Sequence, residues 1–219
     1  MQLLHRLFAG RQSRWLLLAC LGTGCLPLAG CASAASGERM TVPMTAVAGL
    51  QAPPALHHRI AIGQVVGGHD TNPLWMSKVG NPEFARALRD SLAGAGLLAE
   101  GPAPGAYVLS ANLLRLKQPV FGFNMKVTAT VEYELRERAS GLPVFQTQVA
   151  TPYTAEMGDA FLGVERLRLA NEGAIRLNIQ QLIAQLVETF AGYPPPEFGE
   201  GAPVRTEPAP ANPDSPQPP

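Results

Sequence analysis

The clearest hydrophobic pattern in the chain is an alternation over residues 123–137, which read FNMKVTATVEYELRE. Seven apolar side chains alternate there with polar ones. A period of two residues places the two sets on opposite faces of a β-strand. The pattern therefore predicts a long strand with one face in a core and the other in water. The apolar set is Phe123, Met125, Val127, Ala129, Val131, Tyr133 and Leu135.

Shorter patterns predict three more strands and two helices. Residues 59–66 are apolar and β-branched, and further strands are predicted at 107–117 and at 142–154, after the turn ERASGLP. A helix is predicted at 81–100, with Asn81 as its cap, Pro82 at its first position and Gly96 as its stop. The apolar stripe of this helix is Phe84, Leu88, Leu92 and Ala95. A final helix is predicted at 161–190, with the stripe Ile175, Ile179, Leu182, Ile183 and Leu186.

The resulting element order is β-α-β-β-β-α. Two amphipathic helices can cover the single apolar face of such a sheet, so the expected fold class is α+β, a two-layer sandwich. The sheet is expected to be mixed or antiparallel, with both helices on one face and the other face polar.

The N-terminus predicts export. Arg6, Arg11 and Arg14 precede the run WLLLACLGTGCLPLAG, which is too short for a membrane span and is typical of a secretory signal peptide. The run ends at Leu28-Ala29-Gly30-Cys31, which resembles the bacterial lipobox. The resemblance implies cleavage after Gly30 and a lipid on Cys31, which would anchor the chain by its acyl chains. Residue 32 is Ala and not Asp, which by the same resemblance implies the outer membrane. The expected location is its periplasmic face, although the residues leave a surface orientation open.

Composition excludes several kinds of site. All three cysteines lie at or before residue 31, so the mature chain has no disulfide framework and no thiolate metal site. Removing three signal-peptide arginines leaves 14 basic residues against 17 acidic ones, which does not indicate a nucleic-acid surface.

The two ends of the mature chain are expected to lie outside the core. Residues 31–55 are small, contain Pro and Gly and lack periodicity, so they are expected to form a lipidated N-terminus and a flexible tether. Residues 193–219 hold 10 of the 21 prolines and are expected to be a disordered tail. Residues 1–30 as signal peptide and 56–192 as a single α+β domain complete the predicted organisation.

The order of elements resembles that of small periplasmic lipoproteins. These include the lipopolysaccharide-assembly lipoprotein, the curli-secretion lipoprotein, the N-terminal domain of the Tol-system protein and the activators of penicillin-binding proteins. Segments such as TNPLW and EGAIRLNIQQLI are also similar to those of uncharacterised proteobacterial lipoproteins. The resemblance implies a binding or assembly module of the cell envelope.

Two loops carry candidate contact residues. Leu74 and Trp75 lie in the polar loop 67–81, either as a flap over the sheet or as an anchor for a partner. Val120 and Phe121 lie at the hairpin tip 118–124, which either folds back on the domain or contacts a partner or the bilayer.

The sequence does not predict a catalytic or metal site. The glycine-rich loop lacks the GxxxxGK[ST] and GxGxxG motifs, no GxSxG or HExxH motif is present, and neighbouring His57 and His58 would point to opposite faces of a strand. We therefore expect no enzyme, no metal and no cofactor. The expected function is that of a membrane-anchored accessory lipoprotein that acts by protein–protein contact in envelope assembly or transport. The alternative is a periplasmic module that binds a lipid or a glycan between the helices and the sheet.

Overall fold

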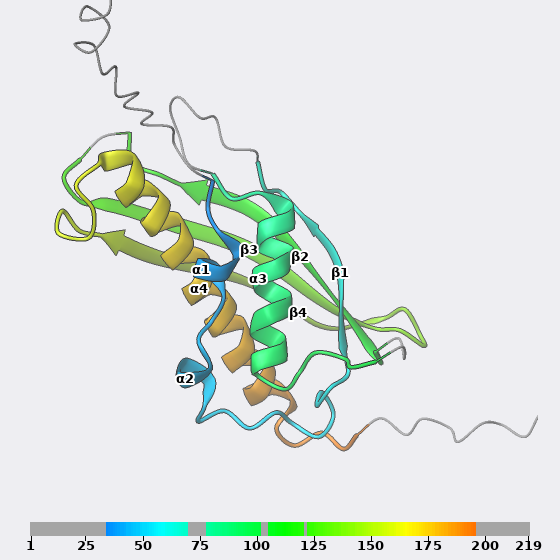
Figure 1. Ribbon diagram of the computed structural model, residues 1–219. Helices are drawn as coiled ribbons and strands as arrows, with labels where there is room; N and C mark the ends of the chain where they lie inside the picture. The colour runs from blue at the N-terminus through cyan, green and yellow to red at the C-terminus, as the bar shows by residue number, and fades with distance from the viewer. Residues whose placement is uncertain (1–33, 70–77, 102–104, 121, 196–219) are drawn as a thin grey trace, which may run out of the picture. The chain divides into compact units, whose positions relative to one another are not determined.

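A computed structural model describes residues 34–69, 78–101, 105–120 and 122–195. Its elements are α1 (Gly37–Met40), α2 (Met44–Val47), β1 (Ile60–Val66), α3 (Asn81–Gly94), β2 (Tyr107–Lys117), β3 (Met125–Glu137), β4 (Pro143–Ala155) and α4 (Gly163–Phe190). The α+β sandwich and the β-α-β-β-β-α order are confirmed, and the helices lie together on one face of the sheet (Figure 1).

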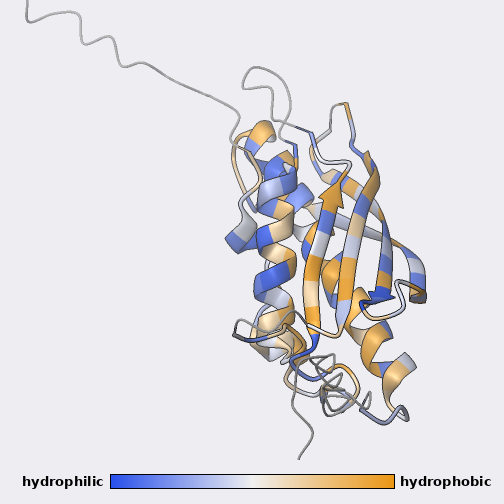
Figure 2. Ribbon diagram, turned by 90° about the vertical axis from the view of Figure 1, so that its right-hand side faces the viewer, coloured by the Kyte–Doolittle hydropathy of each residue, from blue (hydrophilic) through white to orange (hydrophobic). Residues whose placement is uncertain are grey.

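The sheet is mixed, with the strands in the order β1-β2-β3-β4. β1 runs parallel to β2 because α3 makes the crossover between them, while β2, β3 and β4 pair antiparallel through short connections. The predicted alternation along β3 is confirmed from Met125 to Leu135, where the apolar side chains are buried. Figure 2 shows hydrophobic and hydrophilic bands alternating along the strands.

Phe123 is an exception to that alternation, and its assignment to the core is wrong. Its side chain is 76% exposed. The pairing of β3 with β4 ends at Met125 opposite Ala155, and α4 begins only at Gly163, so no strand or helix covers the position of Phe123.

α4 contributes the largest helical face to the core. All five residues of its predicted stripe are fully buried. Close approach to the sheet requires Gly173, because a Cβ there would lie 2.4–2.5 Å from ring atoms of Tyr153 on β4. Asn178, also on α4, accepts a hydrogen bond from the Tyr133 hydroxyl at 2.8 Å and donates one to the Val149 carbonyl at 3.0 Å. This buried pair satisfies polar groups on both layers, and burial raises the pKa of Tyr133.

The ends of α3 agree with the sequence only in part. Gly96 follows the helix with a φ of +68°, as expected of a stop. Asn81 is not the cap: Gly80 occupies that position, and Asn81 is the first helical residue. Its amide oxygen instead accepts a hydrogen bond from the backbone N–H of Gly68 at 2.7 Å, which ties the end of β1 to the start of α3.

The prediction of a flexible tether is wrong for residues 34–55, which we call the N-terminal strap. The strap lies across α3 and α4 and includes α1 and α2 (Figure 1). It buries Ala35, Met40, Val42, Val47 and Ala55. Side chains of the two long helices accept hydrogen bonds from its backbone: Glu172 from Ser36 N at 2.9 Å, Glu83 from Gly37 N at 2.7 Å and Ser91 from Val42 N at 2.9 Å. The strap therefore belongs to the folded domain.

Candidate functional site

Of the five sequence-predicted site residues, the described part of the chain includes only Val120. Cys31, Leu74, Trp75 and Phe121 lie outside the described residues. Val120 is 94% exposed, so this side chain is not folded back on the domain.

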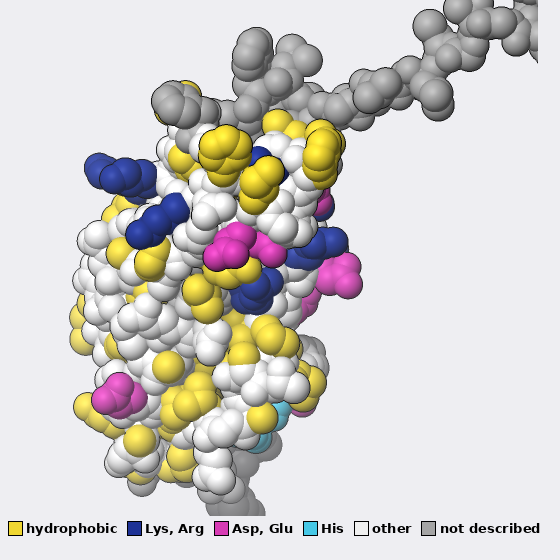
Figure 3. Space-filling view, turned by 90° about the vertical axis from the view of Figure 1, so that its left-hand side faces the viewer, with side chains coloured by type: hydrophobic (Ala, Val, Ile, Leu, Met, Phe, Trp, Pro, Cys, Tyr) yellow, Lys and Arg dark blue, Asp and Glu magenta, His cyan; other side chains and the backbone are white. Residues whose placement is uncertain are grey.

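Val120 lies at one end of the sheet, in a group of exposed apolar side chains that we call the apolar tip. Two loops supply it, the β2–β3 loop and the loop between β4 and α4. Its members are Val120, Phe123, Met157, Phe161 and Leu162. Figure 3 looks onto this end of the molecule, and hydrophobic side chains gather in its upper part.

The two loops of the apolar tip are joined and stiffened by hydrogen bonds. The side-chain oxygen of Asn124, in the first loop, accepts a hydrogen bond from the backbone N–H of Met157, in the second, at 3.2 Å. Within the second loop, the Asp159 carboxylate accepts a hydrogen bond from the backbone N–H of Glu156 at 2.8 Å. The two loops are thus joined to each other and do not project independently.

Arg166 holds the most exposed member of the tip in place. This arginine of α4 is buried, and its Nη1 donates to the carbonyl oxygens of Ala160 at 2.7 Å and Phe161 at 2.9 Å. A hydrogen bond from a charged donor contributes about 1.5–3 kcal/mol. The backbone of Phe161 is therefore fixed while its ring stays 95% exposed.

Sequence reasoning missed four members of the tip. The sequence patterns place Phe123 in the core by alternation, Phe161 and Leu162 at the start of a helix, and Met157 in no element. The available signal is their place in the sequence. Met157, Phe161 and Leu162 all precede the buried stripe of α4, and a hydrophobic side chain before that stripe has no facing residue in the sheet.

The N-terminal strap reaches the domain close to the apolar tip. Ser36 contacts Glu172, and the neighbouring Asn171 accepts a hydrogen bond from Gln118 at 2.7 Å. Gln118 begins the loop that carries Val120 and Phe123. A short chain of contacts thus connects the first described residues with the tip.

Glu172 is the buried ionisable group of this region. Its side chain is almost fully buried, and desolvation raises the pKa of its carboxyl group, against the opposing influence of the Ser36 N–H, Arg168 and Arg39. Its contacts lie within the domain, with Ser36 at 2.9 Å and Arg168 at 3.9 Å. This arrangement indicates a latch for the strap.

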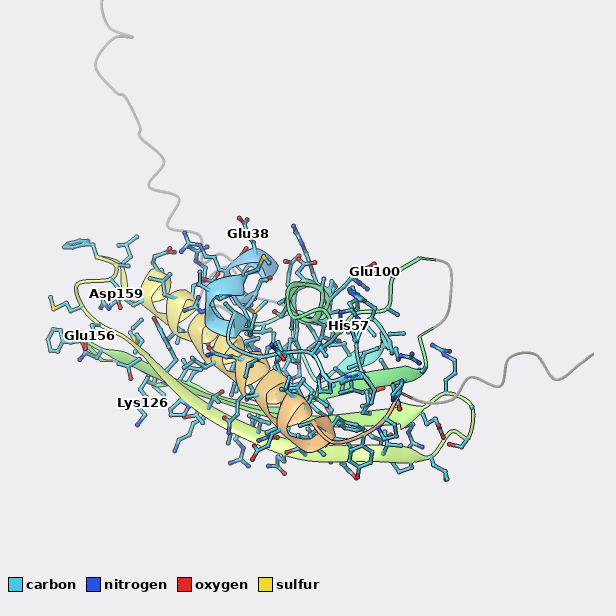
Figure 4. The ribbon with its side chains drawn as sticks, turned by 90° about the horizontal axis from the view of Figure 1, so that it is seen from below. Glu38, His57, Glu100, Lys126, Glu156 and Asp159 are labelled. Carbon is cyan, nitrogen blue, oxygen red and sulfur yellow. The ribbon has the colours of Figure 1, made fainter. Side chains whose placement is uncertain are left out.

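The outer face of the sheet is a second candidate surface. β3 presents Lys126, Thr128, Thr130, Glu132, Glu134 and Arg136 there, between polar residues of β2 and β4. Figure 4 shows the helices on one side of the sheet and this face on the other. Exposed polar partners occur within it, such as Gln146, which donates to Glu132 at 3.2 Å.

The prediction that His57 and His58 lie in a strand and point to opposite faces is wrong. Both residues precede β1 in a turn, where His58 has a φ of +53°. The centroids of their rings lie 4.0 Å apart, and Nδ1 of His58 lies 3.1 Å from Oε1 of Glu100. Among the described residues no group of three His, Cys, Asp or Glu side chains is placed to hold a metal ion. Nor, within those residues, is any helix both long and apolar enough to span a membrane.

A hollow of about 280 Å³ lies beside the end of β1, lined in part by His69, Lys78, Arg115 and Gln118. A second hollow of about 320 Å³ lies at the outer edge between α4 and β4, lined in part by Thr151, Leu177 and Gln181. The interface between the helices and the sheet is otherwise filled by side chains: Leu88 of α3, Ile179 of α4 and Val131 of β3 are all fully buried. A lipid or glycan at that interface would have to separate the two layers.

Comparison with known proteins gives no family for the chain, since no family model and no curated protein matches it. Solved structures with partial similarity include a DUF330 protein from Xanthomonas campestris, which is 12% identical with a TM-score of 0.43, covering 64% of this chain and 91% of that one. A minor lipoprotein from Acinetobacter baumannii is 12% identical with a TM-score of 0.41, covering 61% and 94%. The PelC dodecamer from Paraburkholderia phytofirmans is 15% identical with a TM-score of 0.40, covering 62% and 92%. Values this low do not assign a function.

Proposed function

We propose that this chain is a lipid-anchored accessory protein of the bacterial cell envelope, attached through Cys31 to the outer membrane on its periplasmic side. The observation that carries the proposal is the sequence Leu28-Ala29-Gly30-Cys31, which closes a short apolar run after a basic start. The order of the chain supports it, because the folded domain begins at Ala35, directly after the proposed lipid site.

The proposed mode of action is protein–protein contact, not catalysis. Buried polar groups described above bond within the domain, such as Tyr133 with Asn178 and Glu172 Oε1 with Ser36, while Glu172 Oε2 and Arg166 Nε have no hydrogen-bond partner among the described residues. The surfaces that are left for function are contact surfaces: the outer face of the sheet and the apolar tip. A role in envelope assembly or transport, through an envelope protein partner, fits these surfaces.

The anchor is tested by acyl labelling of the full chain in a bacterial host. Cys31→Ser is expected to abolish incorporation of labelled palmitate and to move the protein out of the membrane fraction. Cys25→Ser is the matched control, because Cys25 lies in the same apolar run, and it is expected to keep both properties. Palmitate incorporation into the Cys31→Ser protein would contradict the proposal.

The partner is tested by photo-crosslinking in cells from two positions on the outer face of the sheet. Thr128 on β3 and Gln148 on β4 both point away from the helices. A crosslinkable residue at either position is expected to capture the same envelope protein, and one at Glu38, in the strap on the helical side, is expected not to. Failure of both outer-face positions to capture a protein would contradict this part of the proposal.

A further inference from the structure

The apolar tip is a surface without a partner within the described residues. Phe123 is 76% exposed and Phe161 95% exposed, on loops that are held in place by Asn124 and Arg166. A soluble domain rarely leaves two phenylalanine rings and further large apolar side chains exposed on two joined loops, and such patches mark contacts with proteins or membranes. The question is which occupant the structure favours.

The length of chain between Cys31 and the domain favours a membrane. Ala35 is buried, and its backbone N–H donates to the carbonyl oxygen of Lys78 at 3.2 Å. It lies four positions after Cys31, and an extended chain spans at most about 3.5 Å per position, or roughly 14 Å in all. If Cys31 is acylated, as proposed above, the domain cannot leave the bilayer surface.

The contacts of the strap identify which part of the domain is near that surface. Ser36 donates a hydrogen bond to Glu172, and the preceding residue of α4, Asn171, accepts one from Gln118 at the start of the loop that bears Phe123. The end of the domain that carries the apolar tip is therefore the end at which the lipid-bearing chain arrives.

The charges around the tip balance. Lys117 and Lys126 flank the first loop, and Glu156 and Asp159 lie in the second. Figure 4 labels Lys126, Glu156 and Asp159 at this end of the molecule. Electrostatic attraction to anionic lipids is therefore not expected to drive membrane contact. The expected driving force is burial of the apolar side chains at the boundary between head groups and acyl chains. This composition suits a zwitterionic lipid surface.

We infer that the apolar tip rests in the interfacial region of the bilayer to which Cys31 is anchored, with Phe161 and Phe123 as its main contacts. The inference depends on the proposed lipid anchor. Its consequence is a fixed orientation: the tip faces the membrane, and the opposite end, with the β3–β4 turn, faces the periplasm.

The test uses the full chain, produced in a host that acylates it and reconstituted into phosphatidylcholine vesicles. The environment-sensitive dye NBD is attached to a single new thiol in the Phe161→Cys variant. Leu142→Cys is the matched control, because Leu142 is also apolar and exposed but lies in the β3–β4 turn. Wild-type protein should take no dye and float with the vesicles, which checks the anchor separately.

The dye at position 161 is expected to emit at shorter wavelength and to lose emission when the lipids carry bromine near the top of their acyl chains. The dye at position 142 is expected to behave as in water. Equal behaviour at the two positions in vesicle-bound protein overturns the inference and leaves the anchor intact. A blue shift at 161 without bromine quenching means that protein covers the tip, which also overturns it. Wild-type protein that takes dye and does not float refutes the anchor and the inference together.

Discussion

Two neighbouring residues of β3 should respond in opposite ways to the same substitution. Val127 is fully buried under α4, and Thr128 points to the outer face of the sheet, opposite Lys117 on β2 and Pro152 on β4. Val127→Asp and Thr128→Asp each introduce one carboxyl group on adjacent residues of the same strand. We expect the first to unfold the domain at neutral pH and the second to leave it folded.

The magnitude follows from burial. To stay neutral at pH 7, a buried Asp must have its pKa raised by about 3 units, which costs about 4 kcal/mol. Loss of the buried valine side chain adds about 1.5 kcal/mol or more. The total is comparable with the 5–15 kcal/mol that holds a typical domain together. Thr128→Asp should cost at most about 1 kcal/mol, mainly through β-propensity, and nearby Lys117 reduces the cost.

The assay is chemical denaturation of both variants and the wild type over a range of pH. A raised pKa in the folded state means that the folded protein holds the proton more tightly, so Val127→Asp should lose stability as the pH rises from about 4 and regain it on acidification. Equal midpoints for the two variants, or a less stable Thr128→Asp, would refute the assigned faces of the strand, because a slip of one residue exchanges them.

Two further predictions concern α4 and the strap. Gly173→Ala should destabilise the domain by about 1–3 kcal/mol, because the new methyl group overlaps the ring of Tyr153. Gly158→Ala is the control: its methyl group meets no atom within 4 Å, so the denaturation midpoint should change little. Equal effects of the two substitutions would refute the close packing of α4 against β4. Burial raises the pKa of Glu172, so its ionisation should cost stability as the pH rises above about 4.5. Glu172→Gln keeps an oxygen for the Ser36 N–H and should flatten that loss above about pH 4.5. An unchanged pH profile of the thermal midpoint would argue against the latch.

The fold could be predicted from the sequence because its long elements have strong periodicity. The alternation in β3 and the stripe of α4 each arise from one apolar face against one layer, which hydropathy detects directly. The predicted strand at 107–117 coincides with β2. The predicted element boundaries were wrong where the burial of a residue depends on a neighbouring strand or helix. Phe123 is the example, because it lies beyond the last residue pair of β3 and β4 and is not covered by α4.

The strap could not be predicted in the same way. Its short helices have four residues each, which is too few for a periodic pattern, and its attachment uses backbone N–H groups bonded to Glu172, Glu83 and Ser91. Every residue except proline has a backbone N–H, so these hydrogen bonds cannot be recognised from the residue types of the strap. On α4, Glu172 lies on the side that also carries Ile175 and Ile179, and an acidic residue among buried neighbours is the kind of signal that could have identified a latch.

The strap changes what a lipid on Cys31 would do. With a flexible tether of 24 residues, a domain samples distances of about 25–30 Å from its anchor and every orientation. With the strap docked on α3 and α4 from Ala35 onward, roughly 14 Å of chain remains, and on the inference above the end with the apolar tip faces the lipid surface. Melting the strap, for example by removing its carboxylate acceptors Glu83 and Glu172, would restore the long tether without touching the anchor or the sheet. The domain would then stay attached to the membrane but lose its fixed orientation. The Glu83→Ala, Glu172→Ala double variant should remain in the membrane fraction, while a dye at position 161 should no longer report contact with the bilayer.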